Sequence, residues 1–194
     1  MTSTTVATLD TPDGPFTVVL DADAVLAAGW TAEPASLVAL VHPTLRPAAW
    51  DVAAGRQAAS PMTRSVLDAV VAYYDGDLDA PARITVRQHS GEFRMRAWDA
   101  LRRVPAGERL TYADHATRSG RPAAVRAAAA ACAMNAAALF VPCHRVLRSD
   151  GGLGGFRYGL PLKRRLLDRE TATGAQTVLF TGSGAAAQAP ERSR

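Results

Sequence analysis

The sequence predicts an α+β fold made of two unlike parts. In residues 4–20, an alternation at Thr4, Val6 and Thr8, a Pro-Asp-Gly-Pro turn at 12–15 and a strand-like run at 16–20 are together typical of an antiparallel hairpin. Residues 61–74 and 92–103 instead place apolar side chains at helical spacing. The charge also changes sign: residues 1–89 carry five Arg against ten acids, and residues 90–170 carry fifteen Arg or Lys against seven acids.

The first part, residues 1–88, is expected to be a small antiparallel sheet with helices. After the hairpin, the apolar run at 35–41 is interpreted as a third strand. The helix at 61–74 follows, then an acidic loop at 76–83 that contains a proline, and a short strand at 84–86. The change of charge places the boundary between the two parts at about residue 88.

The second part, residues 89–172, is expected to be mostly helical. Pro105 and Gly107 end its first helix, and Thr111 can cap a second that runs to Arg118. A Gly-containing turn with Pro122 at a first helical position leads into a small-residue helix over 123–134, which gives the outline of a helix-turn-helix.

A last helix is predicted over 160–170. Its leucines would face inward (Leu162, Leu166, Leu167) and its basic side chains outward (Lys163, Arg164, Arg165, Arg169). Residues 173–194, rich in small and polar residue types, are expected to form a disordered tail.

The run Val141-Pro142-Cys143-His144-Arg145-Val146 indicates a reactive thiol. A cysteine is a useful nucleophile only as thiolate, and neighbouring cations or proton acceptors favour that form. The apolar stretch 136–141 that precedes it should be buried. Five glycines within 151–159 allow a loop to approach a ligand closely, although their spacing is not that of a phosphate loop.

Composition excludes several classes of function. No apolar run approaches the roughly 20 residues of a membrane helix, and residues 1–10 do not read as a signal peptide. Two cysteines and four scattered histidines give neither a disulfide framework nor metal-ligand spacing, so a cytoplasmic protein without metal or cofactor is expected. The basic second part points to a polyanion partner, or to a solvated basic surface without a ligand.

Together these segments resemble the O6-alkylguanine-DNA alkyltransferases over about residues 5–172. The segments that carry the resemblance are Phe93 to Trp98, Val104 to Glu108 leading to Tyr112, Arg126, Asn135, Pro142 to Val146, the glycine-rich loop, and Lys163 to Glu170. The resemblance implies a ribonuclease H-like first domain at 1–88 and a winged helix-turn-helix second domain at 89–172. Ala106, Ala136 and Arg157 depart from residue types usual in the family.

The resemblance also implies roles for particular residues. The catalytic set is Cys143 as alkyl acceptor, His144 as its base, Glu170 to orient His144, Asn135 to hold the turn, Tyr112 to donate to the base, and Lys163 near the leaving oxygen. The DNA-binding set is Arg126, which fills the hole left in the base stack, with Tyr112, Ala127 and Arg121. The pocket set is Val146, Phe156, Arg157 and Cys132. His42, His89 and His115 are expected to be non-catalytic, and Cys132 structural.

The implied activity is irreversible transfer of an alkyl group from O6-alkylguanine, and O4-alkylthymine, in duplex DNA to Cys143, once per protein. The base would be flipped out of the duplex, and the protein would act as a monomer or bind DNA cooperatively. Three alternatives are a non-catalytic damage sensor, a cysteine hydrolase, and a methylation-responsive regulator. Each of four residues also has a purely structural interpretation: Arg126 could extend into solvent, Tyr112 could pack between helices, Glu170 could be a surface acid, and Lys163 could be part of a solvated basic face.

Overall fold

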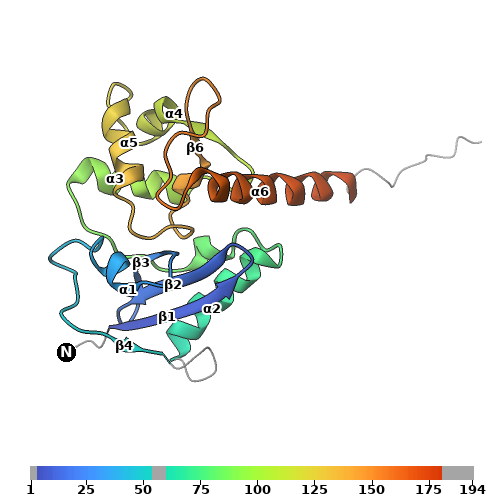
Figure 1. The fold of residues 1–194 in the computed structure, drawn as a ribbon. Helices are drawn as coiled ribbons and strands as arrows, with labels where there is room; N and C mark the ends of the chain where they lie inside the picture. Colours follow the sequence, from blue (N-terminus) through green and yellow to red (C-terminus); the bar gives the residue numbers. More distant parts are fainter. Residues whose placement is uncertain (1–3, 54–59, 181–194) are drawn as a thin grey trace, which may run out of the picture.

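The structure is a computed structural model that describes residues 4–53 and 60–180. It is a mixed α+β fold, in which a small sheet and two helices occupy the lower half of Figure 1 and a group of helices the upper half. Among the described residues the sheet has four strands in the order β3-β2-β1-β4. These are β1 (Thr5–Thr11), β2 (Gly14–Leu20), β3 (Val25–Trp30) and β4 (Asp51–Val52).

The expected hairpin is confirmed. Strands β1 and β2 pair antiparallel, with Val6 opposite Val19 and Thr8 opposite Thr17. Gly14 ends the turn at φ 104°, a left-handed conformation that favours glycine. Because side chains alternate across a strand, the hairpin supplies apolar residues to both faces of the sheet.

The interpretation of residues 35–41 as a strand is wrong. Residues Pro34–Val38 form a short helix, α1, with Pro34 in its first turn. Leu37, Val38 and Val41 are buried, a helical spacing that the uniformly apolar sequence conceals. The third strand is instead β3, whose six residues are all buried and so show no alternation.

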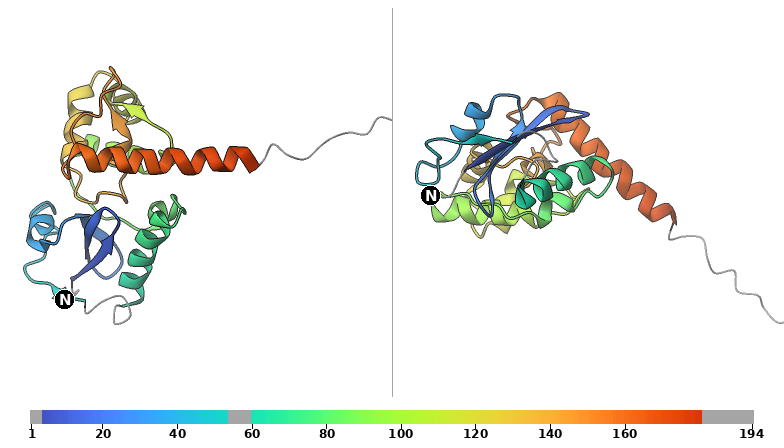
Figure 2. Two further views of the ribbon diagram at one scale, coloured as in Figure 1. Left: turned by 45° about the vertical axis from the view of Figure 1, so that its right-hand side comes forward. Right: turned by 90° about the horizontal axis from the view of Figure 1, so that it is seen from below.

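Two helices cover opposite faces of the sheet, as the left view of Figure 2 shows. On one face, α1 packs with Val6, Val19 and Leu26. On the other lies α2 (Pro61–Tyr74), as expected, with Ser60 accepting a hydrogen bond from Thr63 N at its start. The expected strand at 84–86 is reduced to a bridge between Val86 and Val25, after the short 3-10 helix η1 (Ala80–Arg83).

The upper half is largely helical, as expected. Its helices are α3 (Glu92–Arg102), α4 (Tyr112–Arg118), α5 (Val125–Ala133) and α6 (Leu160–Phe180). Between α5 and α6 lie the 3-10 helix η2 (Cys143–Arg145) and β6 (Val146–Leu147), which pairs in parallel with β5 (Leu110–Thr111).

Three helix ends in this half can be compared with the predicted ones. Thr111 caps α4 as predicted, and with Asp114 it forms a capping box. The helix expected from residue 123 begins at Val125, because Ala124 N first closes a turn onto Arg121 O, so Pro122 lies ahead of it. Helix α6 continues past residue 170 to Phe180, and the rest of the expected tail, 181–194, lies outside the described residues.

The two halves are joined by backbone pairing and a common core. Ala28 of β3 donates its N–H to Ala136 O and accepts from Ala138 N, both at 2.9 Å. Phe16 of the sheet contacts Phe140 edge to face, with ring centroids 6.3 Å apart, and buried leucines of α6 join the same cluster. No helix among the described residues is long and apolar enough to cross a membrane.

Candidate active site

The segment that carries Cys143 is anchored to the sheet. Residues 136–141 are all buried, as expected, and their pairing with β3 fixes them. Within it Leu139 has φ 72°, an uncommon backbone conformation for a residue with a side chain. Such a conformation persists only where the surroundings determine it, and here it turns the chain toward Cys143.

Asn135 holds the turn that presents the thiol. Its amide Nδ2 donates to Val141 O at 2.8 Å and to Cys143 Sγ at 3.2 Å. Burial raises the pKa of Cys143, while the bond from Asn135 and the positive charges of Lys163 and Arg157 act in the opposite direction. The thiol is therefore protonated at rest and needs a base to become a nucleophile.

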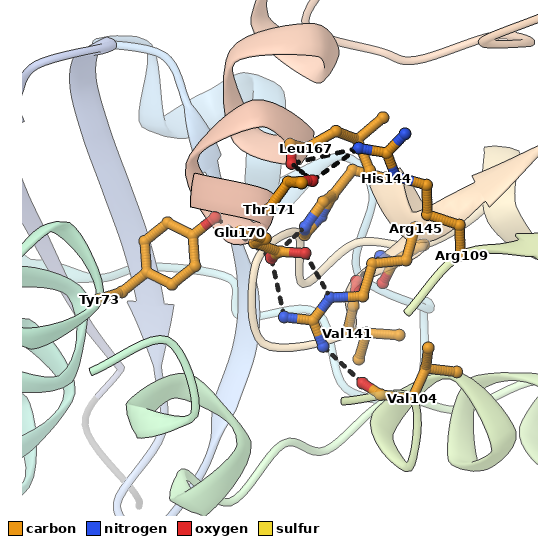
Figure 3. Close-up of polar contacts among 10 residues, drawn as sticks. Tyr73, Val104, Arg109, Val141, His144, Arg145, Leu167, Glu170 and Thr171 are labelled. Carbon is orange, nitrogen blue, oxygen red and sulfur yellow. Dashed lines mark hydrogen bonds and ion pairs between the residues drawn. The ribbon is translucent and has the colours of Figure 1, made fainter. Parts of the chain in front are cut away.

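Next to Cys143 along the chain, His144 and Arg145 form a buried network with Glu170 (Figure 3). His144 Nε2 lies 2.9 Å from Glu170 Oε1, and Arg145 donates to the same carboxylate through Nε at 3.0 Å and Nη2 at 2.8 Å. Tyr73 of α2 donates to Glu170 Oε1 at 3.3 Å, so the lower half contributes to the network. The third guanidinium nitrogen of Arg145, Nη1, donates to Val104 O.

The network fixes the protonation of its members. Burial alone would raise the pKa of Glu170, but His144 and Arg145 lower it to about 2. Burial lowers the pKa of His144, which keeps its ring neutral. Because the carboxylate only accepts hydrogen bonds, Nε2 of His144 carries the ring proton.

The other ring nitrogen of His144 is then free to act as a base. Its Nδ1 is buried and has no hydrogen-bond partner among residues 4–53 and 60–180. A neutral imidazole with Nε2 protonated can accept a proton only at Nδ1. A protonated cysteine next to such a histidine, itself oriented by a buried carboxylate, is a set of groups suited to generate a thiolate.

Cys143 lines a pocket of about 410 Å³, a size typical of small-ligand sites. Aromatic side chains form much of its wall: Tyr112, Phe156 and Tyr158. The remaining lining residues come from α5 and the segments around it: Ala129, Cys132, Ala133, Asn135, Ala138, Gly155 and Arg157. The pocket thus has apolar and aromatic walls with a few polar groups, which suits a flat heteroaromatic ring.

Tyr112 meets the glycine-rich loop at the pocket wall. A Cβ atom at Gly154 would lie 2.8 Å from Tyr112 Oη, and Gly154 has φ 65°, so only glycine fits there. Burial raises the pKa of Tyr112, which keeps its hydroxyl protonated and able to donate.

Two of the expected site residues lie elsewhere than expected. Lys163 does not belong to the outward basic face, because it is fully buried and its Nζ donates to Val146 O at 2.6 Å and to Leu153 O. It therefore ties the glycine-rich loop to β6. Val146 is fully buried and is not among the residues that line the pocket. Phe156, Arg157 and Cys132 do line the pocket.

Sequence reasoning missed several residues of this site. Tyr158 is one, since it lines the pocket and packs against Trp30 of β3 with ring centroids 5.4 Å apart. Tyr73 and Arg145 are others, because both bind Glu170. The only available signal was the adjacency of Arg145 to His144, since a buried arginine needs a carboxylate.

The second cysteine has its own histidine. Cys132 Sγ lies 3.7 Å from Nδ1 of His115, whose Nε2 lies 3.0 Å from Ala97 O. Burial raises the pKa of Cys132 far above its usual range. Among the described residues no group of three or more His, Cys, Asp or Glu could hold a metal ion.

Three of the four expected DNA-binding residues lie on the surface, and the fourth, Tyr112, lines the pocket. Arg126 and Ala127 are exposed on α5, and Arg121, in the turn before it, lies over the ring of Phe93 at 5.9 Å. None of the three lines the pocket, although Ala129 and Ala133 of the same helix do. Helix α5 therefore lies between the pocket and the exposed basic surface.

Comparison with known proteins shows what the part of the chain that carries this site is similar to. Residues 92–172 match the family model described as 6-O-methylguanine DNA methyltransferase, DNA binding domain. The chain is 45% identical over 92 residues to the bifunctional transcriptional activator/DNA repair enzyme Ada of Escherichia coli, covering 47% of this chain and 26% of that protein. It is 38% identical over 109 residues to a methylated-DNA–protein-cysteine methyltransferase of Methanothermobacter thermautotrophicus, covering 55% of this chain and 60% of that protein. The matches thus span less than two thirds of these relatives.

Solved structures extend the similarity to the whole fold. The O6-methylguanine methyltransferase of Mycobacterium tuberculosis aligns with a TM-score of 0.69 and 28% identity, covering 93% of this chain and 99% of that one. A structure of the same organism's OGT in complex with DNA aligns with a TM-score of 0.70 and 27% identity, covering 91% and 99%. Residues 92–172 therefore match the DNA-binding domain of the 6-O-methylguanine DNA methyltransferases, within a fold similar throughout to solved O6-methylguanine methyltransferases.

Proposed function

We propose that this protein repairs O6-alkylguanine in duplex DNA by transferring the alkyl group irreversibly to Cys143. The observation that carries the proposal is the arrangement of Cys143 on a pocket with aromatic walls, ahead of the buried pair of His144 and Glu170. The relatives supply the reaction class, because they are named methylated-DNA–protein-cysteine methyltransferases.

The proposed reaction is a displacement at the alkyl carbon. The proton of the Cys143 thiol passes through a water to Nδ1 of His144, and Glu170, held in place by Arg145, stabilises the resulting imidazolium. The thiolate forms the new S–C bond while the bond from the alkyl carbon to O6 breaks, and its electron pair stays on guanine. Tyr112 donates a hydrogen bond to a ring nitrogen, which stabilises the negative charge that develops on guanine, and the leaving base then takes up the proton that the thiol gave to His144. The thioether is stable, so each protein molecule reacts once.

Lys163 has a positioning role in this scheme. Its bonds to Val146 O and Leu153 O hold the glycine-rich loop against the pocket, so that backbone N–H groups of the loop can donate to the leaving oxygen. Burial lowers the pKa of Lys163, and its two bonds to carbonyl oxygens offset part of the cost of enclosing the ammonium group.

DNA would bind to the exposed side of α5. Helices α4 and α5 form a helix-turn-helix, in which Arg126 occupies the space that the flipped nucleotide leaves in the stack, and Arg121 and Ala127 lie against the backbone. In this proposal residues 89–172 are a winged helix-turn-helix domain and residues 1–88 a ribonuclease H-like one. O4-alkylthymine would be a second substrate, since the pocket has room for the smaller ring.

The test is intact-protein mass spectrometry after incubation with a duplex that contains one O6-methylguanine. The wild type should gain the mass of one methyl group in place of one hydrogen and then stop. Cys143→Ser should gain nothing, and Cys132→Ser, the matched control in the same pocket, should gain as the wild type does. DNA binding without any mass gain would identify a damage sensor. Continued turnover of an ester or amide would identify a hydrolase, and either result rejects the proposal.

A further inference from the structure

A second cavity lies beside the active-site pocket and has no place in the proposed chemistry. Its volume is about 180 Å³, below the roughly 300 Å³ at which small-molecule pockets begin, so it suits a single small group. Its basic side chains are Arg46, Arg87, Arg94, Arg157, His42 and His89. No Asp or Glu is among the described residues that line it.

Three of the four arginines keep their charge uncompensated. Arg87 is paired with Asp21 and Asp23. Arg46 donates to the carbonyls of Ala39 and Val41, Arg94 to Ser90 Oγ at 2.6 Å, and Arg157 to Ala133 O at 2.6 Å. Within 4–53 and 60–180 none of these three has an ion pair with a carboxylate. Such bonds to neutral groups orient a guanidinium and leave its charge available to an anion.

Several of the basic side chains in this cavity come from the half of the chain that is acidic overall. Residues 1–89 carry a net negative charge, with five arginines against ten acids, yet two of those five arginines line this cavity. Two of the four histidines of the chain, His42 and His89, lie there as well, with ring centroids 4.6 Å apart. An acidic half therefore places its basic groups against the basic half.

The cavity is continuous with the proposed DNA surface. Arg157 lines both this cavity and the active-site pocket. Arg94 also lines a neighbouring hollow together with Ala127 and Ala130 of α5. Gln88, in the cavity wall, donates to Asn135 Oδ1 at 3.2 Å and accepts from Ala136 N at 2.9 Å. A strand lying along the exposed side of α5 would thus pass from Arg126 over Arg94 toward Arg46.

We propose that this arginine cavity binds one phosphate of the DNA backbone next to the flipped nucleotide, so that Arg46 of the N-terminal half takes a direct part in DNA binding. This rests on the proposed function for its partner, DNA. A phosphate is small, anionic and able to accept from several guanidinium groups at once. Because a phosphate contact involves no nucleobase, the cavity would add affinity for DNA without any preference for sequence.

The experiment is fluorescence anisotropy with an unmodified duplex over a series of salt concentrations, with Arg46→Gln and Arg94→Gln. The matched control is Arg83→Gln, which removes one charge from an exposed arginine that is paired with Asp77 and does not line the cavity. Each cavity variant should lower the slope of log affinity against log salt by about 0.9 and the affinity by about fivefold, while the control changes neither. Arg46→Lys, which keeps the charge, should restore most of the slope.

Three further measurements distinguish a loss of phosphate binding from a loss of the alkyl-transfer reaction or of the fold. Reaction with free O6-methylguanine base should be unchanged in both cavity variants, and the thermal midpoint shows whether the loop that Arg46 braces is intact. Free inorganic phosphate could occupy the cavity in place of a DNA phosphate, and broadening of its ³¹P resonance on addition of the protein measures that binding. If phosphate binds in an Arg46-dependent way while the salt slope stays that of the wild type, the DNA assignment is wrong. Slopes equal to that of Arg83→Gln would also reject it. If the slopes change but no alkyl transfer occurs, this inference stands and the proposed chemistry fails.

Discussion

Replacing Glu170 with Gln should destabilise the protein and change how its stability depends on pH. The carboxylate is almost fully buried and accepts bonds from His144, Arg145 and Tyr73. Gln keeps the shape but leaves the buried guanidinium of Arg145 without a counter-charge. Breaking a buried ion pair on one side typically costs about 3–5 kcal/mol of unfolding free energy.

The lowered pKa of Glu170 gives a similar value for its contribution to the free energy of unfolding. Its ordinary value of 4.5 falls to about 2 in the fold, and such a difference corresponds to about 3 kcal/mol at neutral pH. Because the pKa is lower in the folded state, this contribution is complete above about pH 4.5 and is lost as the pH falls toward 2.

Urea denaturation of the wild type and Glu170→Gln at neutral pH and at about pH 3 checks this argument. The difference in unfolding free energy should be about 3 kcal/mol at neutral pH and clearly smaller in acid. Tyr73→Phe, which removes one bond of 3.3 Å to the same carboxylate, should cost about 1 kcal/mol or less. A Glu170→Gln difference below about 1 kcal/mol, or one that does not change with pH, would refute the reasoning.

Three further outcomes are expected. Arg126→Ala should weaken repair of duplex DNA far more than reaction with a free O6-alkylguanine base, and equal losses measured by protein mass would reject a role in flipping. Gly29→Ala should cost about 1–3 kcal/mol in denaturation and slow the reaction, because its Cβ would lie 1.8 Å from Tyr158 Oη, and an unchanged thermal midpoint would contradict this. Thr111→Ala should cost about 1 kcal/mol by removing the cap of α4, whereas Thr111→Ser should keep the cap, and equal losses for the two would argue against capping.

The sequence predicted elements where local pattern and burial agree. The hairpin was located correctly from its Pro-Asp-Gly-Pro turn and the residues on either side of it, although residues 16–20 of β2 are all buried, and α2 was located from its helical spacing. Strand β3 was missed because both of its faces are covered, which removes the alternation, and its Ala-Ala-Gly centre has low strand propensity. The run 35–41 was misread for a related reason, since a short helix and its turn can be as apolar as a strand.

In the site, too, residues close together in the sequence were predictable and residues brought together only by the fold were not. Cys143 and His144 are adjacent, so the sequence itself indicated a reactive thiol there, whereas the role of Asn135 was implied by the family resemblance. The burial of Lys163 could not, because the carbonyls that accept from it belong to segments remote from α6. Tyr73 is farther still from Glu170 along the chain, and only the packing of α2 against α6 brings the two together.

The backbone pairing of Ala28 with residues 136–138 has a consequence for how the chain folds. The strand order of the sheet is completed by a segment more than a hundred positions later, and the aromatic cluster of Phe16 and Phe140 forms across the same seam. Neither half can close its core alone, so a fragment cut near residue 88 would expose apolar surface and an unpaired strand edge. Unfolding should therefore occur in one cooperative step, and insertions should be tolerated in loops away from this seam rather than at the boundary suggested by the change of charge.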